Sequence, residues 1–152
     1  MRTFLFITCA LIINLTSGQT AKDYFNEEVK DAQLATAQTI MTALENGKIE
    51  LAGMFFDDSI KNLRSELNYI SSEISKVKAE TKLSIVIVFD QASNIYRCRY
   101  SNDSDELFQV DLFMSEGQAN SKVKKLEIKN SDVLKMEAKE RMEMKEPPLP
   151  PN

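Results

Sequence analysis

Apolar residues in the first half of the chain recur at the spacing of an α-helix. Over 23–46 they follow one another every three or four residues, and Gly47 then offers the left-handed backbone conformation that ends a helix. The apolar stretch 49–56 predicts a short second helix. Asp57 and Asp58 can then act as N-caps of a third helix, which is predicted from its apolar spacing of three and four. This stripe consists of Ile60, Leu63, Leu67, Ile70, Ile74 and Val77.

The apolar spacing changes from the helical period to alternation at Thr81. Four strands are predicted from there, over 83–89, 95–100, 107–114 and 123–129. The connections between them are short and rich in turn-forming residues, which favours antiparallel pairing of consecutive strands. We therefore predict an α+β domain in which N-terminal helices pack on a four-stranded antiparallel meander.

The register can be predicted because residues paired across two strands point to the same face. Pairing Cys98 with Val110 places Arg97 opposite Asp111, and the same rule then predicts Val86 beside Cys98. The face predicted to lie against the helices consists of Val86, Val88, Tyr96, Cys98, Tyr100, Phe108, Val110, Leu112, Leu126 and Ile128.

The predicted outer face combines a row of charges with an apolar patch. Arg97, Asp111 and Lys125 form the row, with Lys125 opposite Asp111. The patch lies on the first two strands and consists of Ile85, Ile87, Phe89 and Ile95. A patch of this kind marks a covered surface. Either a second copy of the chain or the folded-back C-terminal segment would cover it, and we predict it as a homodimer face.

The first 18 residues have the layout of a secretory signal peptide. Arg2 precedes an apolar run over 4–15, which is shorter than the roughly 20 residues that span a membrane. We predict cleavage near Gly18 and export to the periplasm or the medium, with an uncleaved anchor as the alternative. The remaining chain has 18 basic and 23 acidic residues, a net charge of −5 that argues against nucleic-acid binding. One domain is predicted over 19–131, and a charged tail ending in prolines over 132–152.

The amino-acid composition argues against most classes of catalytic site. The chain has no histidine, and its four glycines do not form a phosphate-binding loop. Asp57 and Asp58 are candidates for a general acid or base, with helix capping as the alternative. The stretch 102–106 offers oxygen ligands for calcium, with a solvated turn as the alternative. We expect no enzyme, no cofactor and no metal.

Tyr96 and Tyr100 are predicted to point inward beside Cys98, the cysteine that remains once the signal peptide and its Cys9 are removed. Buried hydroxyls need partners, and a cavity between sheet and helices would hold a small apolar ligand; core packing is the alternative. The candidate pocket residues are Phe55, Tyr69, Tyr96, Cys98, Tyr100, Phe108, Val110 and Leu112.

The order of helices and strands resembles the nuclear-transport-factor-2-like superfamily, a cone-shaped, cystatin-like α+β fold. The likeness covers Asp23 to Asn130 and rests on the stretch ALENGKIELAGMFFDDSIKNL and on the four strands. The early strands of fuller members and the His and Asp pairs of that superfamily's enzymes have no counterpart here. The resemblance implies a small secreted bacterial member of undefined function, dimeric through its outer sheet face.

Together these features predict an exported, non-enzymatic domain that forms a homodimer and holds a small apolar ligand between sheet and helices. An interaction or structural module that uses the third helix and the C-terminal tail is the alternative function.

Overall fold

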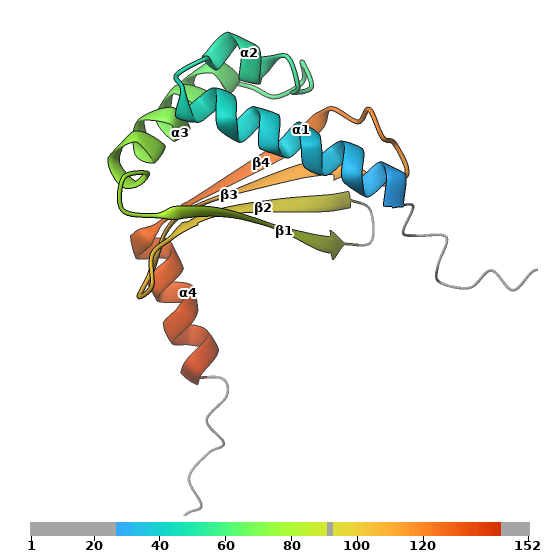
Figure 1. Cartoon of the computed structure of the whole chain (residues 1–152). Helices are drawn as coiled ribbons and strands as arrows, with labels where there is room; N and C mark the ends of the chain where they lie inside the picture. Colours follow the sequence, from blue (N-terminus) through green and yellow to red (C-terminus); the bar gives the residue numbers. More distant parts are fainter. Residues whose placement is uncertain (1–26, 91–92, 144–152) are drawn as a thin grey trace, which may run out of the picture.

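The computed structural model describes residues 27–90 and 93–143. Its helices are α1 (Glu27–Glu45), α2 (Ile49–Gly53), α3 (Leu63–Val77) and α4 (Ser131–Glu143). Its strands are β1 (Lys82–Asp90), β2 (Ser93–Ser101), β3 (Glu106–Ser115) and β4 (Val123–Asn130). The strands form one antiparallel sheet in the order β1-β2-β3-β4, which confirms the predicted meander (Figure 1). The predicted signal peptide over 1–18 lies outside the described residues.

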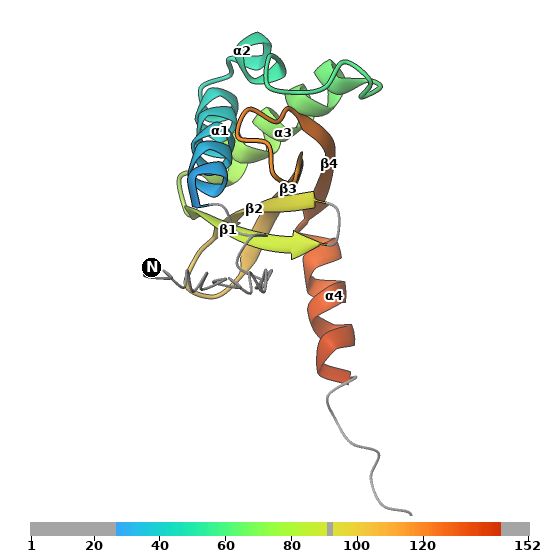
Figure 2. The same ribbon diagram turned by 90° about the vertical axis from the view of Figure 1, so that its right-hand side faces the viewer.

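Helices α1, α2 and α3 lie on one face of the sheet, and α4 projects from the opposite face (Figures 1 and 2). The predicted α+β class, with N-terminal helices packed on the sheet, is therefore confirmed. The core between the two layers is apolar, and burial of each large side chain there stabilises the fold by about 1.5–3 kcal/mol. Its largest fully buried members include Ile40, Met41, Leu44, Phe56, Leu67, Ile70, Ile74, Tyr96, Tyr100, Phe108 and Leu112.

Helix α3 begins three residues later than its apolar stripe predicts. Asn62, the residue before it, has a φ of 57°, in the left-handed region, so the helix cannot extend back through this position. The predicted N-cap role of Asp57 and Asp58 is thus wrong. Asp57 Oδ1 instead accepts a hydrogen bond of 2.9 Å from the amide of Ser59, in a turn that precedes the helix.

The register of β2 and β3 is the predicted one. Cys98 pairs with Val110, and Arg97 pairs with Asp111. The register of β3 and β4 differs by two residues, so that Asp111 lies opposite Glu127 and not opposite Lys125. A shift of two residues keeps the side chains from Lys125 to Asn130 on their predicted faces. Val123 is the exception, because it pairs with Met114 beyond the irregularity and is fully buried in the core. The irregularity that accompanies it falls between Phe113 and Met114.

The predicted register of β1 and β2 is wrong by one residue. Ile85, not Val86, pairs with Cys98, and Ile87 pairs with Tyr96. The ladder extends as far as Asp90 and Ser93, which leaves two residues between the strands, and a connection of that length sets the register.

This correction changes the predicted dimer face. Ile85 and Ile87 lie on the inner face and pack against the core, and Phe89 shares that face by alternation. Val86 takes the outer position, opposite Arg97. Of the four residues predicted for the outer patch, only Ile95 lies on the outer face.

The predicted tail over 132–152 begins as a helix. Asn130 caps α4, since its Oδ1 accepts a hydrogen bond of 3.1 Å from the amide of Val133. Leu134 is buried, and Lys129 Nζ of β4 lies 2.7 Å from Glu137 Oε1. The first turns of α4 therefore pack on the outer face of β3 and β4, and the rest of the helix projects away from the sheet (Figure 2). The proline-rich end lies outside the described residues.

Candidate functional site

The side chains predicted to line a ligand pocket pack into the core. Tyr96, Cys98, Tyr100, Phe108, Val110 and Leu112 all have an exposed fraction of 1% or less. Phe55 is partly buried against the same core. Tyr69 does not join them, because it lies on the outward side of α3 with 44% of its surface exposed.

Both inward tyrosine hydroxyls have partners within the protein. Tyr96 Oη lies 3.2 Å from the carbonyl oxygen of Lys30 and 3.2 Å from Gln33 Oε1, and it donates to one or the other. Tyr100 Oη donates to Glu45 Oε1 at 2.6 Å. These hydrogen bonds to α1 fasten the sheet to the helical layer, so the arrangement favours core packing of the tyrosines.

Gln33 holds a buried polar cluster that the sequence pattern did not reveal. Its Nε2 donates to the carbonyl oxygens of Ser115 and Gln118, both at 2.8 Å. Its Oε1 accepts from Asn94 Nδ2 at 2.9 Å and is one of the two acceptors within reach of Tyr96 Oη, at 3.2 Å. The cluster ties the β3–β4 connection and the start of β2 to α1. The position of Gln33 could have indicated this cluster, because Gln33 lies on the buried side of α1, where an amide without a hydrogen-bond partner would be costly.

Burial and the negative charge of Asp31 raise the pKa of Tyr96 to about 12. Because this pKa is above its ordinary value of 10.0, the unfolded chain loses the hydroxyl proton first. The contribution of the Tyr96 hydroxyl to the free energy of unfolding is complete below pH 10 and is lost as the pH rises towards 12.

We expect the free energy of unfolding to fall by about 1–2 kcal/mol over that interval. Urea unfolding at several alkaline pH values measures this slope. The Tyr96→Phe variant should show a flatter slope, and an equal slope in both proteins would contradict the assignment.

Cys98 is fully buried between the two tyrosines, and burial raises the pKa of its thiol well above its ordinary range. A thiol reagent reacts with the thiolate, so native Cys98 should be modified at least about a hundredfold more slowly than in urea. Time courses with a chromogenic disulfide measure both rates. A Ser84→Cys variant supplies an exposed thiol on β1 as the fast control, and rapid modification of native Cys98 would contradict its inward placement.

Asp57 and the 102–106 stretch both serve local structure. Hydrogen bonds from the side chain and the backbone of Ser59 lower the pKa of Asp57, which keeps this carboxyl group ionised and opposes a role as general acid. In the 102–106 stretch, Asn102 Oδ1 accepts hydrogen bonds from the amides of Ser104 and Asp105 at 2.9 and 2.8 Å. Both arrangements are turns closed by a side chain.

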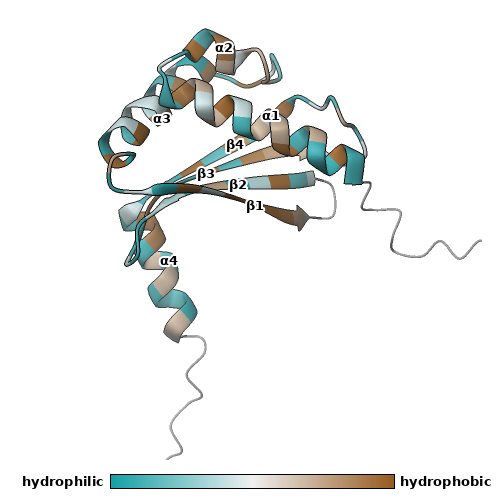
Figure 3. Cartoon of the chain, in the orientation of Figure 1, coloured by the Kyte–Doolittle hydropathy of each residue, from teal (hydrophilic) through white to brown (hydrophobic). Residues whose placement is uncertain are grey.

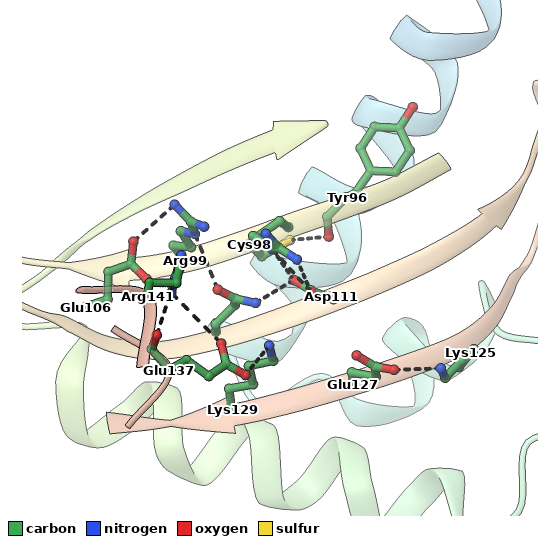
Figure 4. A network of polar contacts seen from close by, with 12 residues as sticks. Tyr96, Cys98, Arg99, Glu106, Asp111, Lys125, Glu127, Lys129, Glu137 and Arg141 are labelled. Atoms are coloured by element: carbon green, nitrogen blue, oxygen red, sulfur yellow. Dashed lines mark hydrogen bonds and ion pairs between the residues drawn. The ribbon is translucent and has the colours of Figure 1, made fainter. Parts of the chain in front are cut away.

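The outer face of the sheet carries a charge network (Figure 4). Arg97 binds Asp111 through Nε and Nη2 at 2.9 to 3.2 Å, and Asp111 is only 2% exposed. Gln109 Nε2 donates to Asp111 Oδ1 at 2.9 Å, while Arg99 lies 3.0 Å from Glu106. The predicted Arg97–Asp111 pair is therefore confirmed, and it is more deeply buried than an exposed charge row.

An apolar strip lies beside this network. We name it the outer strip, and it consists of Val86, Val88, Ile95 and Phe113. Val88 pairs with Ile95, which pairs in turn with Phe113, so these three lie side by side. Lys125 Nζ lies 4.7 Å from the centre of the Phe113 ring, and Val86 is 48% exposed.

The two edges of the sheet differ in how they are protected. The start of β4 is covered, because Val123 makes two backbone hydrogen bonds of 2.9 Å, one with Phe55 and one with Asp57. In addition, four of the eight residues of β4 are charged. The β1 edge is different: Leu83 to Phe89 contains no charge, and most of this strand is apolar (Figure 3). A long apolar edge strand is a template for pairing with another strand.

Within residues 27–90 and 93–143, no helix combines the length and apolarity needed to cross a membrane. No family model, no curated protein and no solved structure matches this chain. The fold is therefore described from the structure alone, as an α+β domain with helices followed by a four-stranded antiparallel sheet.

Proposed function

We propose that this protein is an exported, non-enzymatic domain that associates with itself through the β1 side of its sheet. The observation that carries the proposal is the difference between the two sheet edges. Natural proteins protect edge strands with charge, with short length or with a covering segment. β4 has charge and a covering segment, whereas β1 presents nine residues with charge only at its ends.

The packing of the inner sheet face favours a domain that holds no small ligand between sheet and helices. An apolar molecule placed between sheet and helices would have to displace the hydrogen bonds of Tyr96 and Tyr100 to α1. Every buried side-chain nitrogen and oxygen of the described residues has a hydrogen-bond partner. Such satisfaction is typical of a packed core.

We also infer a distant relation to the nuclear-transport-factor-2-like superfamily, among its small secreted members. The support is the order of the elements and the turn at Gly47, whose φ is 67°, between α1 and α2. An experimental structure with a sheet that curves around the helices into a cone would support this relation, and a flat sheet would oppose it.

We expect the purified protein to have twice the mass of its chain in light scattering coupled to size-exclusion chromatography. Val86→Lys should reduce the mass to that of one chain, because it places a charge on the apolar edge. Leu51→Lys, at a similarly exposed apolar site on α2, is the matched control and should remain dimeric. A wild-type protein with the mass of one chain at high micromolar concentration would refute the proposal.

The projecting part of α4 favours a second candidate, an interaction module that uses its C-terminal region. Met136 and Met142 on this helix are 61% and 67% exposed. If α4 mediates association, Met136→Glu combined with Met142→Glu will abolish the dimer while Val86→Lys leaves it intact. The reverse result supports the β1 edge.

A further inference from the structure

We propose that two copies of this chain join their sheets edge to edge, with β1 antiparallel to β1 around a two-fold axis at Val86. This inference rests on the self-association proposed above and names its geometry. The product is one continuous sheet with eight strands, four from each copy. A two-fold arrangement is self-complementary and closed, so association stops at the dimer.

The faces of β1 restrict the register of such a pairing. Paired residues must point to the same side of the sheet. Ile85 and Ile87 point inward, opposite Cys98 and Tyr96, and Val86 points outward. The two-fold axis must therefore pass through a residue position and not between two positions.

The charges at the ends of β1 select one of the remaining registers. With the axis at Val86, Lys82 of each copy lies opposite Asp90 of the other, since both are four residues from the centre. An axis at Ile85 places Lys82 opposite Val88, and an axis at Ile87 places Asp90 opposite Ser84. Only the Val86 register matches the opposite charges at both ends, and opposite charges across antiparallel strands are favourable.

The same register matches the apolar residues between the charges. Ile85 faces Ile87 of the second copy, and Leu83 faces Phe89, so inner side chains meet inner side chains. Val86 and Phe89, which are 48% and 44% exposed in the single chain, both come to lie at the junction. The pairing therefore covers exposed apolar surface, and the edge backbone groups of β1, which pair with no other strand within residues 27–90 and 93–143, gain partners.

The alternative of stacking two outer faces meets an obstacle. The first turns of helix α4 pack on β3 and β4 at that face, and the rest of the helix projects outward from it (Figures 1 and 2). The centre of the face carries the Arg97–Asp111 pair, whose remaining exposed surface would lose water without gaining a partner. Edge pairing leaves both features undisturbed.

Disulfide trapping tests the register in the full chain. Directly opposite residues of antiparallel strands have Cα atoms about 4.5–5.5 Å apart, within disulfide range. Val86→Cys should therefore form an intermolecular disulfide on mild oxidation, and peptide mapping by mass spectrometry should place it between the two copies of residue 86. Ser84→Cys is the matched control on the same strand face. Its copies lie more than about 13 Å apart in this register and should not link.

A charge exchange provides a second test that needs no cysteine. Lys82→Glu alone, or Asp90→Lys alone, should weaken the dimer by about two- to tenfold, because each places like charges together at two sites. The double variant should restore the wild-type dissociation constant. Analytical ultracentrifugation over a dilution series measures all four proteins.

The outcomes separate this inference from the proposed function. The register is wrong if a disulfide forms with Ser84→Cys or Phe113→Cys but not with Val86→Cys. It is also wrong if the charge variants leave the dissociation constant of the dimer unchanged. In both cases the proposed self-association remains supported. A protein that is monomeric at all concentrations overturns both the register and the self-association. A monomer is the result expected if another part of the same chain covers β1.

Discussion

Replacement of Gln33 by leucine is expected to lower the free energy of unfolding by about 3 kcal/mol. Leucine has a similar volume but cannot bond to the carbonyl groups of Ser115 and Gln118 or to the amide of Asn94. Each buried polar group left without a partner costs about 1–3 kcal/mol, and the gain in apolar burial offsets part of the sum. Urea unfolding followed by circular dichroism gives the value.

Gln38→Leu is the matched control, because Gln38 lies on the exposed side of the same helix. This change should alter stability by no more than about 0.5 kcal/mol. Hydrogen exchange adds a local readout, since the amides of the β3–β4 connection should exchange faster only in the Gln33 variant. Equal effects of the two substitutions would show that the buried amide is not what holds the connection.

The second large effect is expected at Ile87 and follows from the register of β1. Ile87→Asp should lower the free energy of unfolding by about 2–4 kcal/mol, because it places a carboxylate against the core beside Tyr96. Val86→Asp, one residue earlier on the outer face, should cost less than about 1 kcal/mol. Both are measured by urea unfolding at a concentration at which the wild-type protein is monomeric.

This pair of variants discriminates between two registers. If Val86 were paired with Cys98, as the sequence pattern predicts, the order of the two effects would be reversed. If Val86→Asp lowers the free energy of unfolding more than Ile87→Asp does, the register that pairs Val86 with Cys98 is the correct one. That result would also remove the basis for a β1 edge pairing centred on Val86.

The β2 and β3 strands could be predicted with their faces because each has one apolar and one polar side. Tyr96, Cys98 and Tyr100 alternate with arginines, and a shift by one residue would bury Arg97 against the helices. The alternation of side chains is therefore sufficient to predict the pairing of Cys98 with Val110.

The candidate site was predicted less well, for two separate reasons. β1 is apolar on both sides, so either register buries an apolar set, and the tight connection to β2 decided between them. The Gln33 cluster joins residues that are 61 and more positions apart, so no local pattern can show that their polar groups meet.

The sequence by itself determined the three N-terminal helices, the four strands, the antiparallel order and the charged-to-apolar partition of β2 and β3. The elements and their faces follow from periodicity, and the antiparallel order follows from the short connections; both are local properties of the sequence. Only the tertiary structure decided which side of β1 faces the helices, how α4 lies on the outer face and which sheet edge the described residues leave uncovered. Those depend on the length of a turn and on which groups meet across the chain, and neither is encoded in the period of a single strand.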